Sequence, residues 1–196
     1  METTFKSYCS KRISYIITTK NRAIHLRHCL SNIKIIKKNR DEVILIDGSS
    51  SDGTHKVVKD FSDIIDVYVS EPDLNGPHAF NKGYMLANGK YIKPINDDDI
   101  FYKEALEKAH QVMEKNPEVD MIVCGGTQKQ DGKETVIYVP PGSNYGSSVD
   151  DIFKNGFTTS GMGIFFRRSL LLKVGLFEFT SPFPDMGFIL RSIYLG

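Results

Sequence analysis

The segment Tyr91–Tyr102, YIKPINDDDIFY, decides the fold, because an apolar run gives way within a few residues to acid and then to a helical pattern. Residues 91–96 have the length and apolar character of a buried strand. Three adjacent carboxylates, Asp97, Asp98 and Asp99, follow at once. Neighbouring like charges repel by roughly 1 kcal/mol even in water. The acidic run is therefore predicted either to form a hydrated turn or to surround a positive charge.

The same succession of apolar run and helical pattern occurs three times before this segment. Strands are predicted over residues 12–19, 42–47, 64–70 and 90–96. Helices are predicted over residues 21–34, 52–61, 76–87 and 102–117. Repeated alternation of strand and helix predicts an α/β fold, with a parallel, doubly wound sheet flanked by helices.

Three residues refine this prediction locally. Asn21 and Asp52 belong to the residue types preferred at helix N-caps, and they are predicted to cap the first and second helices. Pro94 has no backbone N–H to donate, so the fourth strand is predicted to be irregular or to lie near a sheet edge.

The pattern changes after Pro117, towards shorter strands and more turns. Residues 119–126 and 134–140 flank a turn-rich stretch, which predicts a hairpin or meander. Residues 140–148 are predicted to form a loop. A strand running into a short helix is predicted over residues 161–175, and a terminal helix from residue 185.

The composition is that of an ordinary soluble globular domain, with 196 residues, 40% apolar and 25% charged. A net charge of +1 gives no reason to expect nucleic acid or an anionic membrane as the main partner. No run approaches the ~20 apolar residues of a membrane span, and the N-terminus lacks the pattern of a signal peptide. Cys9, Cys29 and Cys124 are odd in number and widely spaced. They favour reduced thiols in a cytoplasmic protein.

Polar residues follow the end of every predicted strand. Ligands of open α/β sheets bind beyond the carboxyl ends of the strands, so these residues are predicted to converge on one edge. The segments concerned are Thr18–Arg22, Asp47–Gly48, Ser70–Glu71 and Asp97–Asp99. These segments combine hydroxyl, basic and several acidic side chains. Such a mixture favours a ligand that contains a phosphate and binds together with a metal ion.

Two common nucleotide-binding motifs are excluded by their spacing. GSSSDGTH, residues 48–55, has the two glycines of a P-loop, but Thr54 and His55 stand where Lys and Ser or Thr are needed. The first strand is followed by TTKNRA, which lacks the glycines of a dinucleotide fingerprint. Asp47 is the remaining candidate at the end of the second strand. Its carboxylate could accept from a nucleobase N–H or a ribose hydroxyl, and it equally suits an ordinary turn residue.

The acidic run suits a divalent cation. In extended backbone Asp97 and Asp99 point to the same side. Such a pair is a hard oxygen clamp for Mg²⁺ or Mn²⁺, ions that take one or two carboxylates and complete their shell with water and phosphate. Three aspartates before a helix suit solvated capping residues equally well.

Four blocks of the sequence together resemble the family 2 glycosyltransferases of the GT-A fold, over about residues 12–191. They are ISYIITTKNR (13–22), VILIDGSSSDGT (43–54), SEPDLNGPHAFNKGYMLANGKYIKPINDDDIFY (70–102) and GIFFRRSLLLKVGLFE (163–178). The resemblance implies one domain, residues 1–196, with a Rossmann-like, mostly parallel central sheet and a smaller mixed β region in its C-terminal half. Residues 1–117 would be the nucleotide-binding half and residues 118–196 the acceptor half.

The resemblance also implies roles for the strand-end residues towards a nucleotide sugar. Thr18, Asn21 and Arg22 would line the nucleotide pocket. Asp47 would hold the base or the ribose. The helix residues Asn81 and Lys82 would lie by the diphosphate or the sugar.

The acidic run would be the D-x-D metal motif of the family. Asp97 and Asp99 would hold Mn²⁺ or Mg²⁺, with Asp99 the direct ligand and Asp97 nearer the ribose or the metal. The middle residue, Asp98, would contact the sugar.

The segment PFPDMGFILR, residues 182–191, offers one acidic residue as the catalytic base, Asp185. Pro184 stands where the family commonly has a first acid, and Arg191 has the expected later place. Asp185 equally suits the N-cap of the last helix. His78 would touch the sugar or be an exposed helix histidine.

The function implied by the resemblance is metal-dependent, inverting transfer of a sugar from a nucleoside diphosphate, with UDP favoured. The acceptor would be a carbohydrate or a lipid-linked hydroxyl in surface polysaccharide synthesis. The enzyme would be cytoplasmic, with peripheral association at the inner face of the membrane.

Two alternatives stay open. The chain ends directly after the helix of Asp185, where many relatives continue, so a truncated or inactive nucleotide-sugar binder is one. A sugar nucleotidyltransferase is the other, although TTKNRAIHL lacks the glycine-rich phosphate loop of that class.

Overall fold

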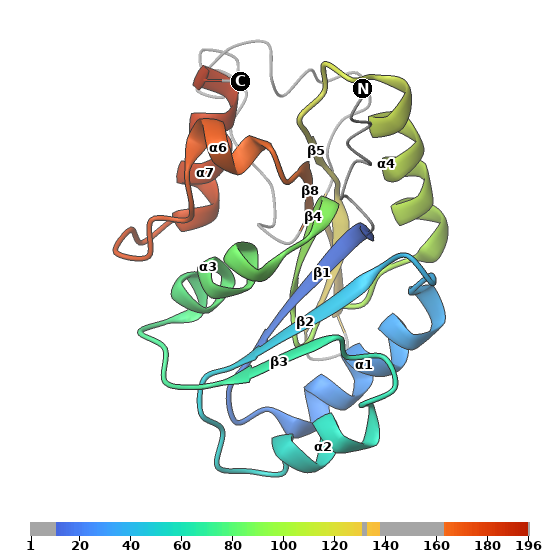
Figure 1. Cartoon of the computed structure of the whole chain (residues 1–196), viewed down its shortest axis with the longest axis vertical. Helices are drawn as coiled ribbons and strands as arrows, with labels where there is room; N and C mark the ends of the chain where they lie inside the picture. The colour runs from blue at the N-terminus through green and yellow to red at the C-terminus, as the bar shows by residue number, and fades with distance from the viewer. Residues whose placement is uncertain (1–10, 131–132, 138–162, 196) are drawn as a thin grey trace, which may run out of the picture.

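The structure is a computed structural model that describes residues 11–130, 133–137 and 163–195 (Figure 1). Its strands are β1 Lys11–Thr19, β2 Glu42–Asp47, β3 Val67–Ser70, β4 Gly89–Asn96, β5 Met121–Val123, β6 Gly126–Gln130, β7 Lys133–Ile137 and β8 Ile164–Arg167. Its helices are α1 Ala23–Ile36, α2 Thr54–Asp60, α3 Gly76–Leu86, α4 Lys103–Lys115, α6 Leu170–Val174 and α7 Pro184–Leu195. The predicted alternation of strands and helices through α4 is confirmed.

The main sheet has six strands in the order β3-β2-β1-β4-β8-β5. The four strands β3, β2, β1 and β4 are mutually parallel. β8 pairs antiparallel with both β4 and β5, so the sheet is mixed at that side. The predicted α/β fold with a mostly parallel central sheet is confirmed, and strands from both halves of the sequence belong to this one sheet. The division into a nucleotide half and an acceptor half stays a prediction.

Helices cover both faces of the sheet (Figure 1). Alternate residues of β1 point to opposite faces, as strand geometry requires. Ile13, Tyr15 and Ile17 pack in one apolar core with α1, α2 and α4. Ile16 packs in the other core with α3, α6 and α7. Burial on both faces explains why the parallel strands read as continuous apolar runs.

The first helix is capped differently from the prediction. Asn21 adopts a left-handed backbone conformation (φ 53°) and does not cap α1. Asp52 instead accepts a hydrogen bond from the N–H of Ala23, the first residue of α1, at 3.0 Å. It also accepts one from Thr54 N–H at the start of α2, at 2.9 Å. One carboxylate thus stabilises the starts of two helices. The N-cap of α2 is Gly53, one residue after the predicted Asp52, whose carboxylate reaches the first helical N–H from the preceding position.

The prediction that Pro94 marks an irregular or edge strand is wrong. β4 is a central strand, with β1 on one side and β8 on the other. Pro94 continues the pairing with β1, opposite Ile16. β8 pairs with Tyr91 and Ile92, and that pairing ends before Pro94. The missing N–H is therefore tolerated because the neighbouring strand is short.

The predicted hairpin exists, but with different strands. β6 and β7 pair antiparallel, and β6 falls on residues that the sequence predicts as a turn. β5, predicted as the first hairpin strand, joins the main sheet beside β8. The predicted strand-to-helix segment is confirmed as β8 and α6, and the terminal helix as α7. The loop predicted over residues 140–148 lies outside the described residues.

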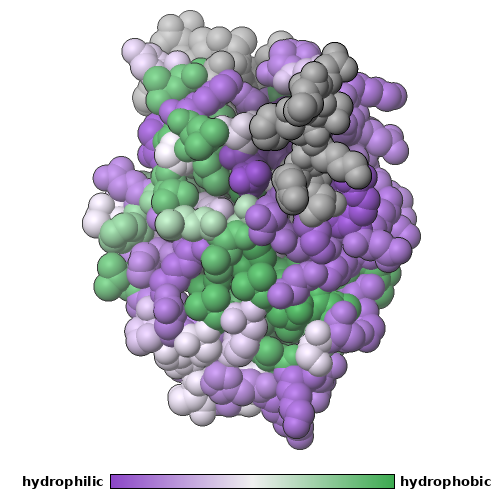
Figure 2. All heavy atoms as spheres, viewed as in Figure 1, coloured by the Kyte–Doolittle hydropathy of each residue, from purple (hydrophilic) through white to green (hydrophobic). Residues whose placement is uncertain are grey.

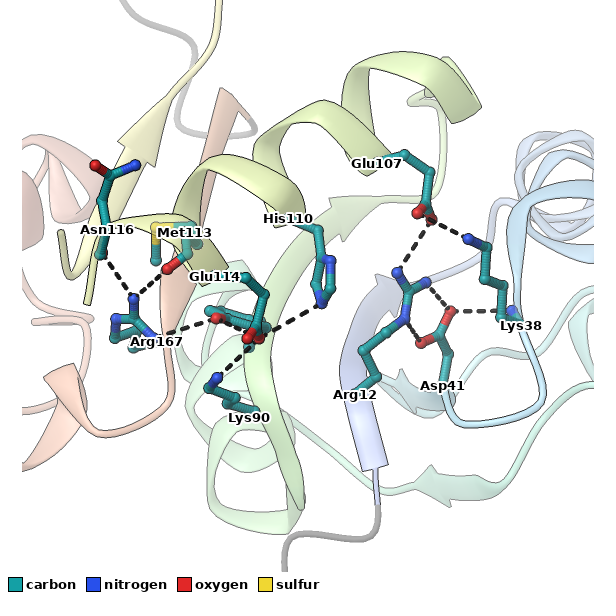
Figure 3. A network of polar contacts seen from close by, with 11 residues as sticks. Arg12, Lys38, Asp41, Lys90, Glu107, His110, Met113, Glu114, Asn116 and Arg167 are labelled. Carbon is teal, nitrogen blue, oxygen red and sulfur yellow. Dashed lines mark hydrogen bonds and ion pairs between the residues drawn. The ribbon is translucent and has the colours of Figure 1, made fainter.

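An ion-pair network stabilises the end of the sheet where the parallel strands begin (Figure 3). Asp41 has no exposed surface, and both its oxygens accept from the Arg12 guanidinium at 2.8 Å. The N–H of Lys38 donates to the same carboxylate at 3.0 Å. Arg12 also contacts Glu107 of α4 at 3.1 Å. The network therefore joins the first two strands to a helix of the core.

A second group of contacts in the same network joins α4 to β4 and β8 (Figure 3). Glu114 of α4 accepts from Lys90 at 2.8 Å and from the hydroxyl of Tyr91 at 2.7 Å. Arg167 of β8 donates to the backbone carbonyl of Asn116 at 3.0 Å. These contacts lie at the edge of the sheet opposite to the polar strand ends.

Replacing Asp41 with alanine is expected to lower the free energy of unfolding by about 3–5 kcal/mol, because Arg12 would remain largely buried without its partner. Urea denaturation measures this loss. Asp63→Ala is the matched control, since Asp63 forms an exposed pair with Lys34, and exposed pairs contribute little to stability. Equal losses in the two variants would contradict the structural role given to Asp41.

Across the described residues, every helix falls short of the length and apolar character needed to span a bilayer. Figure 2 shows apolar side chains gathered near the middle of one face, with polar side chains around them.

Candidate active site

The carboxyl ends of the four parallel strands meet at one edge of the sheet. Thr18 lies opposite Ile46 on one side and Asn96 on the other. Asp47 lies opposite Thr19 and opposite Ser70. The predicted convergence of the polar strand ends is confirmed by this register.

The three aspartates form a turn and do not extend the strand. β4 ends at Asn96, and Asp99 N–H donates to Asn96 O at 3.1 Å. The Asp99 carboxylate accepts in return from Asn96 N–H at 3.0 Å. The expectation that the acidic run is extended is wrong, because this turn reverses the backbone.

A positive charge lies among the carboxylates, which answers the question raised by the acidic run. The Arg22 guanidinium pairs with Asp97 at 2.9 Å and also with Asp98. Thr19 Oγ1 donates to the second oxygen of Asp97 at 2.6 Å. Asp97 is only 4% exposed. The loop after β1 thus supplies both partners of the buried carboxylate.

Burial raises the pKa of Asp97, outweighing the opposing effects of the Thr19 hydrogen bond and the Arg22 charge. Burial also raises the pKa of Asp99, against the hydrogen bond from Asn96 N–H, and the charge of Asp98 raises it further. Ionised carboxylates in such a place are stabilised by any added cation.

The residues of the turn fit a divalent cation that is shared with a ligand. One carboxylate oxygen of Asp99 accepts the hydrogen bond from Asn96 N–H. No group of three or more His, Cys, Asp or Glu side chains forms a ready-made metal cage within the described ranges. Mg²⁺ and Mn²⁺ do not need such a cage, because one or two carboxylates with ligand phosphates and water complete their shell.

Asp47 is fully buried, and its carboxylate is saturated with donors. Ser50 donates to one oxygen through its N–H, at 3.0 Å, and through its hydroxyl. Tyr68 and Ser70 donate to the other oxygen at 3.1 and 2.8 Å. The carboxylate therefore organises the loop after β2, and the predicted contact of Asp47 with base or ribose stays a prediction.

The loops after β1 and β2 are joined to each other. Asn21 N–H donates to Ser50 Oγ at 2.8 Å, and Asn21 Oδ1 accepts from Ser51 N–H at 2.7 Å. Asn21 thus fixes the loop that carries Arg22. Thr18, one residue inside β1, is half-buried at the same edge.

The two predicted donor-site residues of α3 have protein partners. The amide of Asn81 exchanges two hydrogen bonds with the backbone of Phe177, at 2.8 and 2.9 Å, and ties α3 to the segment after α6. Lys82 pairs with Glu71 at 3.0 Å and donates to Pro72 O at 2.8 Å. Lys82 therefore lies beside the residues that follow β3.

Asp185 lies in the first turn of α7, half-buried. Its carboxylate accepts from Met186 N–H at 2.9 Å. Arg191 of the same helix donates to the carbonyls of Val174 and Leu176, at 2.9 and 2.6 Å, which fixes α7 against the end of α6. Within the described ranges, no hydrogen bond or ion pair joins Asp185 to the acidic turn.

The imidazole of His78 is occupied by neighbouring groups. Its Nδ1 accepts from Leu74 N–H at 3.1 Å. Its ring packs against Phe179, with the ring centres 5.4 Å apart. Asn75, the N-cap of α3, donates to Phe179 O at 2.7 Å, so the segment before α7 lies against the start of α3.

The interpretation of the sequence gives no individual role to two residues of this edge, although Thr19 lies within the predicted strand-end segment Thr18–Arg22. Thr19 holds Asp97, and the alternation of side chains along β1 distinguishes it from Thr18. Asp73 lies against Gly48, at the end of β2. The signal in the sequence is an acidic residue just after the third strand together with a glycine just after the second.

Solved glycosyltransferase structures share this architecture. Staphylococcus aureus TarS, residues 1–349 in complex with UDP-GlcNAc, matches with a TM-score of 0.71 and 18% identity, over 93% of this chain and 53% of that one. The mannosyltransferase PcManGT of Pyrobaculum calidifontis, in complex with GDP-Man and Mn²⁺, matches with a TM-score of 0.66 and 21% identity, over 90% and 50%. The class of the domain is therefore the GT-A fold.

The model of Glycosyl transferase family 2 matches residues 14–175, and the chain belongs to this family. An uncharacterized glycosyltransferase of Rickettsia prowazekii is 26% identical over 173 residues, covering 86% of this chain and 54% of that protein. The poly-beta-1,6-N-acetyl-D-glucosamine synthase of Staphylococcus epidermidis is 22% identical over 174 residues, covering 85% and 42%. The chain thus spans about half the length of these relatives.

Proposed function

We propose that the protein transfers a sugar from a nucleoside diphosphate, with UDP favoured, to an acceptor hydroxyl with inversion at the anomeric carbon. The observation that carries the proposal is the acidic turn of Asp97, Asp98 and Asp99, placed at the polar edge of a family 2 GT-A domain with Arg22 among its carboxylates. The edge combines acids that suit a cation with basic groups that suit a phosphate.

The donor would lie along the carboxyl ends of the strands. Thr18, Asn21 and Arg22 would contact the nucleotide from the loop after β1. The basic group of Lys82 would face the diphosphate or sugar, with Asn81 holding its helix in place, and Asp98 would contact the sugar. Asp47 would act on the base or ribose directly or through the loop that it organises.

Asp97 and Asp99 would hold Mn²⁺ or Mg²⁺. The bound ion supplies Lewis-acid stabilisation of the charge that develops on the leaving diphosphate. The raised pKa of both carboxyl groups supports this role, because a cation offsets the cost of keeping them ionised and buried. Arg22 can then contribute its charge to the diphosphate.

Asp185 would be the general base. Its carboxylate would take the proton of the acceptor hydroxyl as that oxygen forms a bond to the anomeric carbon. The bond from this carbon to the diphosphate oxygen breaks on the opposite side, and its electron pair leaves with the nucleoside diphosphate. One displacement of this kind inverts the anomeric centre.

The biological setting belongs to the same proposal. The synthase of Staphylococcus epidermidis makes a polysaccharide, as its name says, and this supports a carbohydrate or lipid-linked acceptor in surface polysaccharide synthesis. Such a role would place the protein in the cytoplasm, in peripheral contact with the inner face of the membrane.

The full chain, incubated with Mn²⁺ and a panel of UDP-, GDP- and TDP-sugars, tests the proposal through release of nucleoside diphosphate. We expect binding that EDTA abolishes and release that an acceptor hydroxyl accelerates. Nucleotide affinity that ignores EDTA would count against metal-dependent transfer. Binding without turnover on any acceptor would favour a nonenzymatic binder, and release of pyrophosphate from nucleoside triphosphates would favour a nucleotidyltransferase.

A further inference from the structure

The amide of Asn81, on α3, is bound to the segment that leads to Asp185. Asn81 is 7% exposed. Its amide nitrogen donates to Phe177 O at 2.8 Å, and its amide oxygen accepts from Phe177 N–H at 2.9 Å. Both ends of the amide are therefore engaged by one residue of the protein, in a place that solvent barely reaches. The side chain of Asn81 is directed at this residue and not at a bound diphosphate.

Residues 175–183, here called the connecting segment, join α6 to α7 and run beside α3 (Figure 1). The structure describes all of them, and Phe177 is the one residue among them that is buried. Asn81 thus binds the connecting segment at its enclosed residue. Closer to α7, the amide of Asn75 donates to Phe179 O at 2.7 Å. The connecting segment is therefore held against α3 at two points.

Phe177 extends this link to α7. Its ring packs edge-on against the ring of Phe188, with the ring centres 5.2 Å apart. Phe188 has no exposed surface and lies about one helical turn after Asp185 in α7. Two successive contacts therefore join the amide of Asn81 to the helical turn that carries Asp185.

The other end of this link is fixed to the sheet. Gly83 lies on α3 close to Asn81, and a Cβ at Gly83 would overlap Cγ2 of Ile16. Helix α3 therefore packs directly on β1, the strand that supplies Thr19 to the Asp97 carboxylate. The position of Asp185 relative to the acidic turn is thus set through α3.

We propose that Asn81 is a positioning residue for the general base: by holding Phe177 it sets where Asp185 stands, and it acts on the acceptor step and not on donor binding. This inference rests on the proposed function and on Asp185 as its base. A displacement of about 1 Å in a reacting group can lower a rate roughly a hundredfold. Two hydrogen bonds at a distance from the reacting atoms can therefore affect turnover.

Asn81→Ala is expected to lower kcat about ten- to a hundredfold and to leave UDP affinity in Mn²⁺ unchanged. For the full chain, kcat is measured as release of nucleoside diphosphate from UDP-, GDP- and TDP-sugars, with an N-acetylglucosamine oligomer as acceptor. Calorimetric titration measures the affinity on the same preparation. Asn116→Ala is the matched control, because the Asn116 amide also donates to a backbone carbonyl, Val112 O, at 2.7 Å. This residue ends α4, away from the polar strand ends, and its replacement should change neither quantity.

The double variant of Asn81→Ala and Asp185→Asn tests whether Asn81 acts through Asp185. Its kcat is expected to lie within about twofold of that of Asp185→Asn alone, because groups that act as one unit do not add their effects. A general loosening of α3 predicts a different result. The two losses would then multiply, and UDP affinity would fall as well, because Lys82 belongs to the same helix.

Asn75→Ser is a milder second variant, which remains informative if Asn81→Ala does not fold. Serine can still cap α3 by accepting from His78 N–H, as Asn75 does. It lacks the amide group that donates to Phe179 O. We expect kcat to fall about three- to tenfold and UDP affinity to stay unchanged.

The outcomes separate this inference from the function beneath it. If Asp185→Asn lowers kcat but the asparagine variants leave kcat unchanged, weaken UDP, or add their full loss to that of Asp185→Asn, Asn81 does not position the base and the transferase proposal stands. If Asp185→Asn leaves kcat unchanged, the assignment of the base and this inference fail together, while transfer itself stands. If the wild type releases no diphosphate from any sugar of the panel, the proposed function fails too.

Discussion

Asp99→Asn is expected to reduce sugar transfer roughly a thousandfold, because the acidic turn would lose the anionic oxygen that holds the divalent cation. Stabilisation of a leaving group by a metal contributes several kcal/mol, and each 1.36 kcal/mol changes a rate tenfold. The substitution preserves shape, since an amide oxygen can still accept from Asn96 N–H as the carboxylate does. Diphosphate release at saturating donor and Mn²⁺ measures the loss, and calorimetry measures the accompanying fall in Mn²⁺-dependent UDP affinity.

Asp63→Asn is the control for this experiment, because it removes one carboxylate from an exposed ion pair between the turn after α2 and Lys34 of α1. Its turnover and thermal denaturation should match the wild type. Undiminished transfer and Mn²⁺ dependence in Asp99→Asn would show that the acidic turn is a solvated cap, which is the plain alternative that the sequence leaves open.

Asp185→Asn is expected to lower kcat by about 10²–10⁴-fold and to leave donor affinity unchanged. A positioned general base contributes an effect of this size, and it acts on the acceptor and not on the nucleotide. The amide oxygen can still accept from Met186 N–H, so the start of α7 is preserved. Acceptor-dependent turnover and UDP binding, measured on the same preparation, separate the two effects.

A role for Asp185 in the start of α7 alone predicts a different result. In Asp185→Asn both kcat and the melting temperature would stay near the wild-type values, because the amide oxygen keeps the hydrogen bond from Met186 N–H. That outcome would falsify the assignment of Asp185 as base, and another acidic side chain at the polar edge would then have to take the proton.

Much of the fold follows from the sequence, because the apolar runs of the parallel strands are buried on both faces and therefore continuous. Residues 12–19 and 42–47 are predicted as strands and form β1 and β2 with nearly the same bounds. The order of the strands in the sheet is a different matter, because it depends on contacts between distant segments. β8, predicted only as a strand near residue 164, lies between β4 and β5.

The errors in the fold share one physical origin. A proline disrupts a central strand only where a neighbouring strand would need its N–H. β8 pairs with Tyr91 and Ile92 and ends before Pro94, and the residues around Pro94 do not reveal how short that partner is. The cap of α1 comes from Asp52, 29 residues away from Ala23. Local propensity places Asn21 there instead, although its backbone joins the loop after β2.

The candidate site is predicted in outline, because parallel strands bring their polar ends to one edge. Its finer geometry is not, since the turn at Asp97–Asp99 depends on hydrogen bonds that close back onto Asn96. Thr19 and Arg22 are brought to Asp97 by the pairing of β1 with β4. The four donors that hold the Asp47 carboxylate come from residues 50, 68 and 70, and the sequence around Asp47 does not show them.

One end of the sheet carries contacts that stabilise the fold, and the other end carries the candidate site. This separation affects how the protein can change over evolution. The buried pair of Arg12 and Asp41 lies where the strands begin, and the acidic turn lies where they end, roughly 20 Å away along β1. Substitutions so far apart are expected to be independent in their energies. Residues at the polar strand ends can therefore change while the buried contacts at the other end of the sheet keep the domain folded.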